Sequence, residues 1–117
     1  MKKALVFAAV GEATTGLALL IVPSLAGRLL LGETLTGVAI PVARVAGMAL
    51  IAFGVACWPA SPRVGMLMYS AAVAAYLAYL GFAGVFTGVL LWPAVALHLI
   101  LTALLASAPA RAKETST

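Results

Sequence analysis

Residues 4–22 of this chain, ALVFAAVGEATTGLALLIV, form an apolar stretch that ends at Pro23 and holds one charged side chain, Glu12. Polar and apolar residues do not alternate in it, as they would in a strand of a membrane barrel. A hydrocarbon core of about 30 Å is crossed by roughly 20 apolar residues in a helix. The stretch therefore predicts a transmembrane helix.

The N-terminus also resembles a secretory signal peptide, because Lys2 and Lys3 precede the apolar run. The run is longer than the apolar core of about 7–15 residues that such signals carry. Three more apolar spans follow it. We therefore expect a retained first helix.

The composition places the whole chain in a membrane. It has 117 residues, of which 65% are hydrophobic and 9% are charged, whereas a soluble domain has about 25% charged residues. Asp, Asn and Gln are absent from the sequence. A soluble globular fold is thereby excluded, and the lipid bilayer is the expected environment.

Three further helices are expected at about residues 40–58, 64–82 and 89–106, separated by Pro and Gly. The sequence thus predicts an all-α integral membrane bundle of four transmembrane helices over residues 1–109, followed by a polar tail at 110–117. In the connector 24–37, four leucines favour a short helix in the membrane interface. They are Leu25, Leu29, Leu30 and Leu31.

The basic residues predict the orientation, because Lys and Arg are concentrated on the cytoplasmic side. With both termini on one side, that side holds Lys2, Lys3, Arg63, Arg111 and Lys113. The opposite side holds only Arg28 and Arg44. We expect a multi-pass protein of the cell inner membrane with both termini cytoplasmic.

Three side chains that can carry charge fall inside the expected spans: Glu12, Arg44 and His98. A charge at the bilayer centre costs about 2.5–3.5 kcal/mol or more, so each requires a partner or a function. At 1.5 Å per residue, Glu12 and His98 lie about 12 Å and about 10 Å from the cytoplasmic side, and Arg44 lies higher. In a compact bundle, Glu12 and His98 would be able to meet.

Each of these residues has more than one interpretation. Glu12 is protonated, ion-paired or exposed to a hydrated cavity. Its small neighbours Ala8, Ala9, Thr15 and Gly16 favour a place inside the bundle. Arg44 is an interfacial anchor or the counter-ion of a carboxylate, Glu33 or Glu12. His98 is an imidazole bonded to a tyrosine or threonine, or a ligand of a metal or haem.

The third helix has two expected faces. One carries Tyr69, Tyr76 and Tyr79, and the other carries four alanines suited to tight packing. The alanines are Ala71, Ala74, Ala75 and Ala78. Tyr76 is deep enough that its hydroxyl group is expected to require a hydrogen-bond partner.

Several function classes find no support in the sequence. One histidine and one cysteine, Cys57, do not make a metal site. The serines lack the neighbours of a catalytic nucleophile. The scattered basic residues form no nucleic-acid-binding face. We therefore expect no enzymatic activity, no cofactor and no nucleic-acid partner.

The size, the four spans and the carboxylate of the first helix resemble the small multidrug resistance transporters, dimers that exchange protons for cationic drugs. The resemblance rests on residues 11–16, GEATTG, and implies that Glu12 is the carrier residue. The family expects the order Gly-Thr after the glutamate, whereas this chain has Thr15-Gly16. The family also expects a tryptophan in the third helix, where this chain has tyrosines and no tryptophan.

The same region is similar to the DoxX-like membrane proteins, in Gly11-Glu12, Gly16-Leu17 and Pro23. As a whole, the chain resembles small four-helix bacterial inner-membrane proteins. Two functions follow as hypotheses. The first is a non-enzymatic assembly or accessory subunit of a homo-oligomer or a larger membrane complex. The second is a proton-coupled transporter of small molecules or cations that uses Glu12, with His98 or Tyr76 assisting.

Overall fold

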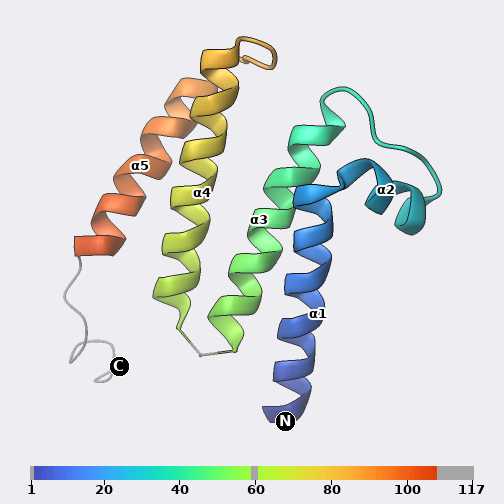
Figure 1. Ribbon diagram of the computed structural model, residues 1–117. Coiled ribbons are helices and arrows are strands. Elements are labelled where there is room, and N and C mark those ends of the chain that lie inside the picture. The colour runs from blue at the N-terminus through green and yellow to red at the C-terminus, as the bar shows by residue number, and fades with distance from the viewer. Residues whose placement is uncertain (1, 59–60, 108–117) are drawn as a thin grey trace.

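The computed structural model describes residues 2–58 and 61–107, and within them the chain forms five helices and no strand. The all-helical prediction is confirmed. The helices are α1 (Lys2–Ile21), α2 (Pro23–Leu31), α3 (Ala39–Cys57), α4 (Pro62–Ala83) and α5 (Leu91–Ser107) (Figure 1). The expected tail at 110–117 lies outside the described residues.

Proline and glycine set the helix boundaries. Pro23 occupies the first turn of α2, where the missing N–H costs nothing, and α1 ends just before it. Two helices, α2 and α4, end at glycines with a positive φ, Gly32 at 87° and Gly84 at 73°. This left-handed conformation favours glycine, because a side chain would clash with the backbone. The long helices therefore start and stop within two residues of the expected positions.

Three helices are long and apolar enough to cross a membrane: α1 from Lys3, α3 and α4. The apolar helix α5 is shorter, with 17 residues. The expected short helix in the first connector is present as α2, and its leucines 25, 29, 30 and 31 are exposed.

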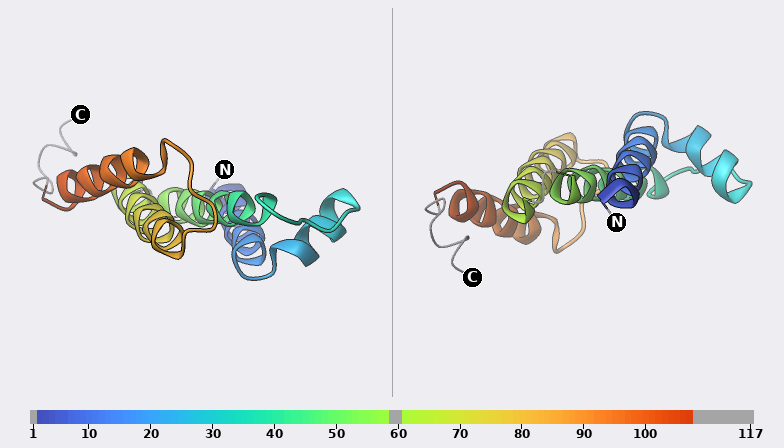
Figure 2. Two further views of the ribbon diagram at one scale, coloured as in Figure 1. Left: turned by 90° about the horizontal axis from the view of Figure 1, so that it is seen from above. Right: turned by 90° about the horizontal axis from the view of Figure 1, so that it is seen from below.

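The four long helices stand side by side in one row, in the order α1, α3, α4, α5 (Figures 1 and 2). The molecule measures 46 × 35 × 16 Å, and a helix with its side chains is about 10–12 Å across. The row is therefore little more than one helix thick. Within the described chain, α1 touches neither α4 nor α5, in contrast to a compact bundle.

Small residues bring neighbouring helices together. A Cβ atom added to Gly16 of α1 would lie 2.5 Å from the carbonyl oxygen of Gly47 in α3. One added to Gly65 of α4 would lie 2.7 Å from the carbonyl oxygen of Ala52. Because lipid offers little hydrophobic drive for association, such close backbone contact is how helices pack in membranes.

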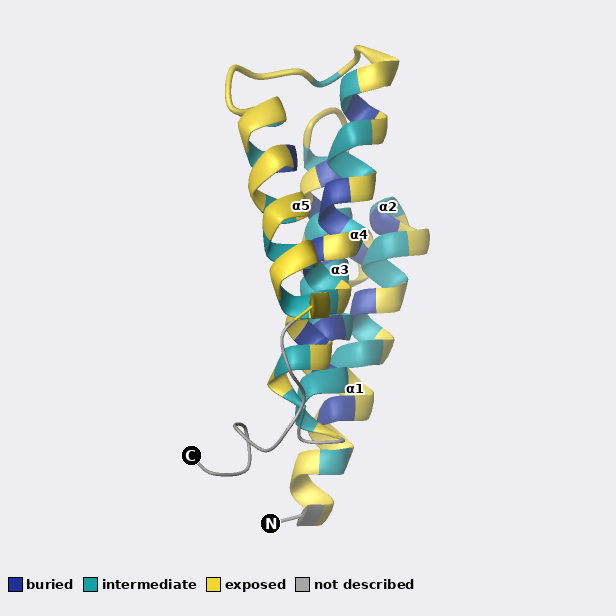
Figure 3. Cartoon of the chain, turned by 90° about the vertical axis from the view of Figure 1, so that its left-hand side faces the viewer, coloured by how far each residue is buried: buried dark blue, intermediate teal, exposed yellow. Residues whose placement is uncertain are grey.

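Exposed residues run along the outside of every helix, and buried residues are few (Figure 3). Many of the exposed side chains are large and apolar, whereas the buried positions hold mostly small residues. Phe7 and Phe82 are more than 80% exposed, whereas the buried hydrophobic residues are mainly alanine and valine. The alanine face expected on α4 is wrong in part, because Ala74 is buried while Ala71 and Ala75 are exposed. The apolar exterior and the three long apolar helices are typical of a membrane protein.

Candidate functional site

Glu12 lies in the middle of α1, half-buried against α3. It lines a cavity of about 140 Å³ together with Phe53, Gly54 and Cys57 of α3. Of its expected small neighbours, Ala9 and Gly16 are buried and Thr15 is half-buried, whereas Ala8 is exposed. Within the part of the chain that the structure describes, the Glu12 carboxyl group makes no hydrogen bond and no ion pair.

Arg44 donates a hydrogen bond from Nε to the carbonyl oxygen of Leu20, over 3.2 Å. Leu20 belongs to the last turn of α1, where carbonyl groups lack partners within the helix and the helix dipole is negative. Arg44 of α3 therefore caps the C-terminal end of α1. Among the described residues, Arg44 forms no ion pair with Glu33 or Glu12, the carboxylates considered for it.

The same device recurs at the far edge of the row. Arg63, at the start of α4, donates from its guanidinium group to the carbonyl oxygen of Ala106 in the last turn of α5, over 3.3 Å. In each of the pairs α1–α3 and α4–α5, an arginine of one helix thus binds the C-terminal end of the other helix. Both arginines lie at helix ends, outside the middle of the apolar spans.

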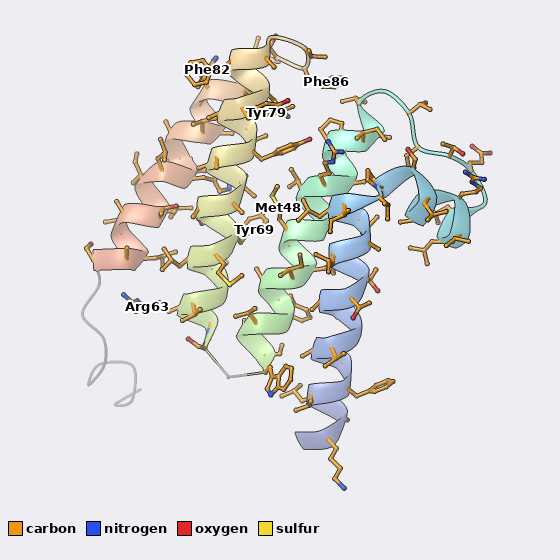
Figure 4. All side chains as sticks on the ribbon, viewed as in Figure 1. Met48, Arg63, Tyr69, Tyr79, Phe82 and Phe86 are labelled. Carbon is orange, nitrogen blue, oxygen red and sulfur yellow. The ribbon has the colours of Figure 1, made fainter. Side chains whose placement is uncertain are left out.

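Arg44 and Tyr76 meet at a cavity of about 190 Å³ between α3 and α4. Tyr79 and Phe86 also line this cavity, and Figure 4 shows both at the end of α4 that leads into the loop before α5. The rings of Tyr76 and Tyr79 are stacked, with centroids 6.3 Å apart and planes at 24°. The cavity thus combines a guanidinium group with two phenols.

His98 lies between α4 and α5, half-buried. Its Nδ1 is 2.8 Å from the carbonyl oxygen of Ala94. A carbonyl only accepts, so Nδ1 is the donor of this bond. The ring meets Tyr69 edge to face at 6.0 Å and 72°.

The expected bond from the imidazole to a tyrosine or threonine is therefore replaced by a bond to the backbone. The Thr102 hydroxyl bonds to the backbone carbonyl of His98, over 2.6 Å, and not to its ring. Within residues 2–58 and 61–107, no group of three or more His, Cys, Asp or Glu residues is placed to hold a metal ion.

The three ionisable residues do not converge. Helices α1 and α5 form opposite edges of the row, and three interaxial steps of about 8–10 Å separate Glu12 from His98 by roughly 24–30 Å. Glu12 also lies eight residues, about 12 Å, before the α1 carbonyl that Arg44 binds. Of the four predicted residues, Arg44 and Tyr76 line one cavity together.

Sequence reasoning missed two features. It grouped the three tyrosines of α4, whereas Tyr69 packs on His98 while Tyr76 and Tyr79 flank the Arg44 cavity. The spacing of three between Tyr76 and Tyr79 was the available signal, since such residues are neighbours on a helix. It also considered Ser70 only as a serine without the neighbours of a nucleophile, whereas Ser70 is fully buried and its hydroxyl lacks a partner among the described residues.

Fold and site together define an all-helical protein with three candidate membrane-spanning helices and polar groups dispersed along one row. Comparison with protein-family models, with curated proteins and with solved structures found no match to this chain.

Proposed function

We propose that this chain is a non-enzymatic, multi-pass inner-membrane protein that acts as a subunit of a homo-oligomer or of a larger membrane complex. The open row supports this proposal, because no other helix of the described residues covers either of its broad faces. One layer of helices leaves polar groups without the second layer that would enclose them.

The observation that carries the proposal is the isolation of Glu12. Its carboxyl group lies in mid-helix of a candidate span without a hydrogen bond or ion pair in the described chain. A charge at this depth costs about 2.5–3.5 kcal/mol, and protonation still leaves a donor to satisfy. A second protein chain packed against α1 at Glu12 supplies the missing partner of the carboxyl group.

In this proposal α5 is the fourth span. Its 17 residues are about 26 Å long, at the short end of the range that crosses a bilayer. Helix α1 begins at the end of the row where α4 begins (Figure 1). That end carries Lys2, Lys3 and Arg63, so we assign it, and both termini, to the cytoplasm.

The test is the oligomeric state of the purified full chain in a mild detergent, by native mass spectrometry and light scattering. We expect a dimer, a higher oligomer or a complex with a copurified membrane protein. Glu12→Leu should weaken the association by about 0.6–1.7 kcal/mol, or roughly three- to twentyfold, as loss of an interhelical hydrogen bond in a membrane does.

The matched control is Glu33→Leu, which removes a carboxylate from the exposed connector before α3. It should leave the association unchanged. A strictly monomeric wild-type protein that copurifies with nothing contradicts the proposal. So does an equal loss of association in the two variants.

The cavity beside Glu12 favours a second candidate function, proton-coupled transport of a small molecule or cation by an oligomer. A carboxyl group that faces a cavity is able to exchange a proton for a substrate. Glu12→Gln should then abolish pH-driven uptake into proteoliposomes, with Glu33→Gln as the control. Absence of uptake by the wild-type protein, or unchanged uptake by Glu12→Gln, removes this candidate.

A further inference from the structure

The Arg44 cavity has unused donors. Only Nε of the guanidinium group is engaged, by the carbonyl oxygen of Leu20. Its two Nη groups make no hydrogen bond to any described residue, although Arg44 lines the cavity. The hydroxyl groups of Tyr76 and Tyr79 likewise make no hydrogen bond to described residues. This cavity, which we call the Arg44 chamber, thus has four donor groups available to an anion.

An apolar groove of about 290 Å³ adjoins this chamber. The two share three lining residues: Pro41, Leu80 and Phe86. The rest of the groove is formed by aliphatic side chains of α3, α4 and α5, together with Val38. They are Val42, Val45, Leu77 and Leu91. A ligand with an anionic group and an apolar chain therefore fits both parts at once.

The depth of the chamber agrees with such a ligand. Arg44 bonds to the last turn of α1, and the cavity extends to Val85 and Phe86, in the loop after α4. These positions mark the end of the helices, where the headgroups of a bilayer meet its hydrocarbon core. A guanidinium group held between helices at this level is placed to donate hydrogen bonds to a lipid phosphate.

We propose that the Arg44 chamber and the adjoining groove bind one anionic phospholipid. The phosphate accepts hydrogen bonds from the two Nη groups of Arg44, a geometry that suits the planar guanidinium fork. Tyr76 and Tyr79 donate to the remaining oxygens, and one acyl chain lies in the groove along α3 and α4. The groove is what distinguishes this ligand from a free phosphate ion, which has no apolar part to bury.

The test uses the full chain, purified and stripped of lipid in detergent, with binding followed by native mass spectrometry. The probes are phosphatidylglycerol and phosphatidylcholine with the same acyl chains, and inorganic phosphate. We expect phosphatidylglycerol to bind more tightly than phosphatidylcholine. Arg44→Gln should weaken phosphatidylglycerol binding about tenfold, the effect of losing hydrogen bonds to a charged group.

Arg28→Gln is the matched control, because Arg28 lies exposed on α2 at the same end of the molecule. It should retain wild-type binding. Since Arg44 also caps α1, Tyr79→Phe serves as a second variant. Tyr79 is 65% exposed, so its change leaves the fold intact and is expected to weaken phosphatidylglycerol binding severalfold.

Three results would overturn the proposal. The first is equal affinity for phosphatidylglycerol and phosphatidylcholine. The second is an equal loss of binding in the Arg44 and Arg28 variants, or wild-type binding of phosphatidylglycerol by Arg44→Gln or by Tyr79→Phe. The third is competition by inorganic phosphate at the concentration of the lipid, which would assign the chamber to a soluble anion.

Discussion

Nε of Arg44 in α3 lies 3.2 Å from the carbonyl oxygen of Leu20 in the last turn of α1. This bond joins a cation to the negative end of a helix dipole, across the helix pair in which Gly16 and Gly47 bring the backbones into contact. It satisfies a carbonyl that α1 itself leaves without a partner, and it holds the guanidinium group beside the tyrosines of α4. One residue thereby links three helices.

Loss of this bond should destabilise the protein. Arg44→Met keeps much of the aliphatic side chain but removes the donors, and should lower the free energy of unfolding by about 1–2 kcal/mol. Titration of the detergent-solubilised protein with a denaturing detergent measures this change. Arg28→Met, on the exposed side of α2, should change it by less than about 0.5 kcal/mol. Equal effects of the two substitutions would show that the cap contributes nothing specific.

Two glycines of α1 should respond oppositely to the same substitution. Gly16→Ala places a methyl group 2.5 Å from the Gly47 carbonyl oxygen, so α1 and α3 must move apart, at a cost of about 1–3 kcal/mol. Gly11→Ala meets no atom within 4 Å, and should be neutral or stabilising by up to about 1 kcal/mol, because alanine favours a helix. Unfolding of both variants in the same detergent measures the difference. Similar values for the two would contradict the observed α1–α3 contact.

The single cysteine tests the proposed orientation. Cys57 ends α3 at the end of the row assigned to the cytoplasm, and it is half-buried. A membrane-impermeant maleimide should therefore label it in inverted vesicles but not in intact spheroplasts. On a Cys57→Ala background, Leu90→Cys should show the reverse pattern, because Leu90 is 73% exposed just before α5 at the opposite end. Labelling of both positions from one side would refute the arrangement of the spans.

His98 should stabilise the fold through the packing of its ring more than through any charge on it. His98→Ala removes the edge-to-face contact with Tyr69, and should cost about 1–3 kcal/mol of unfolding free energy when the lost packing is included. His98→Phe retains a ring against Tyr69 and should recover at least half of that loss. The two variants are compared by the same denaturing titration. An equal loss in both would mean that the Nδ1 bond to Ala94, and not the ring contact, is what stabilises this position.

Much of the secondary structure could be predicted from residues close together in the sequence. Pro23, Pro62, Gly32 and Gly84 mark helix ends because they act on their own backbone dihedrals or hydrogen bonds. The candidate polar residues were also evident, since a charged residue in an apolar run is conspicuous. Their partners were not evident. Arg44 binds a backbone carbonyl, a group that every residue possesses and that no composition or spacing singles out.

The sequence by itself determined that this protein is helical, where its long helices lie and which side chains interrupt their apolar surfaces. These properties follow from local backbone preferences and from the length of each apolar run. Only the tertiary structure decided that the helices stand in a row, with Glu12 and His98 on opposite edges and Arg44 beside Tyr76. A helical wheel gives the direction in which a side chain points, but not which helix lies there. That choice depends on where two backbones approach closely enough to pack, as Gly16 and Gly47 do.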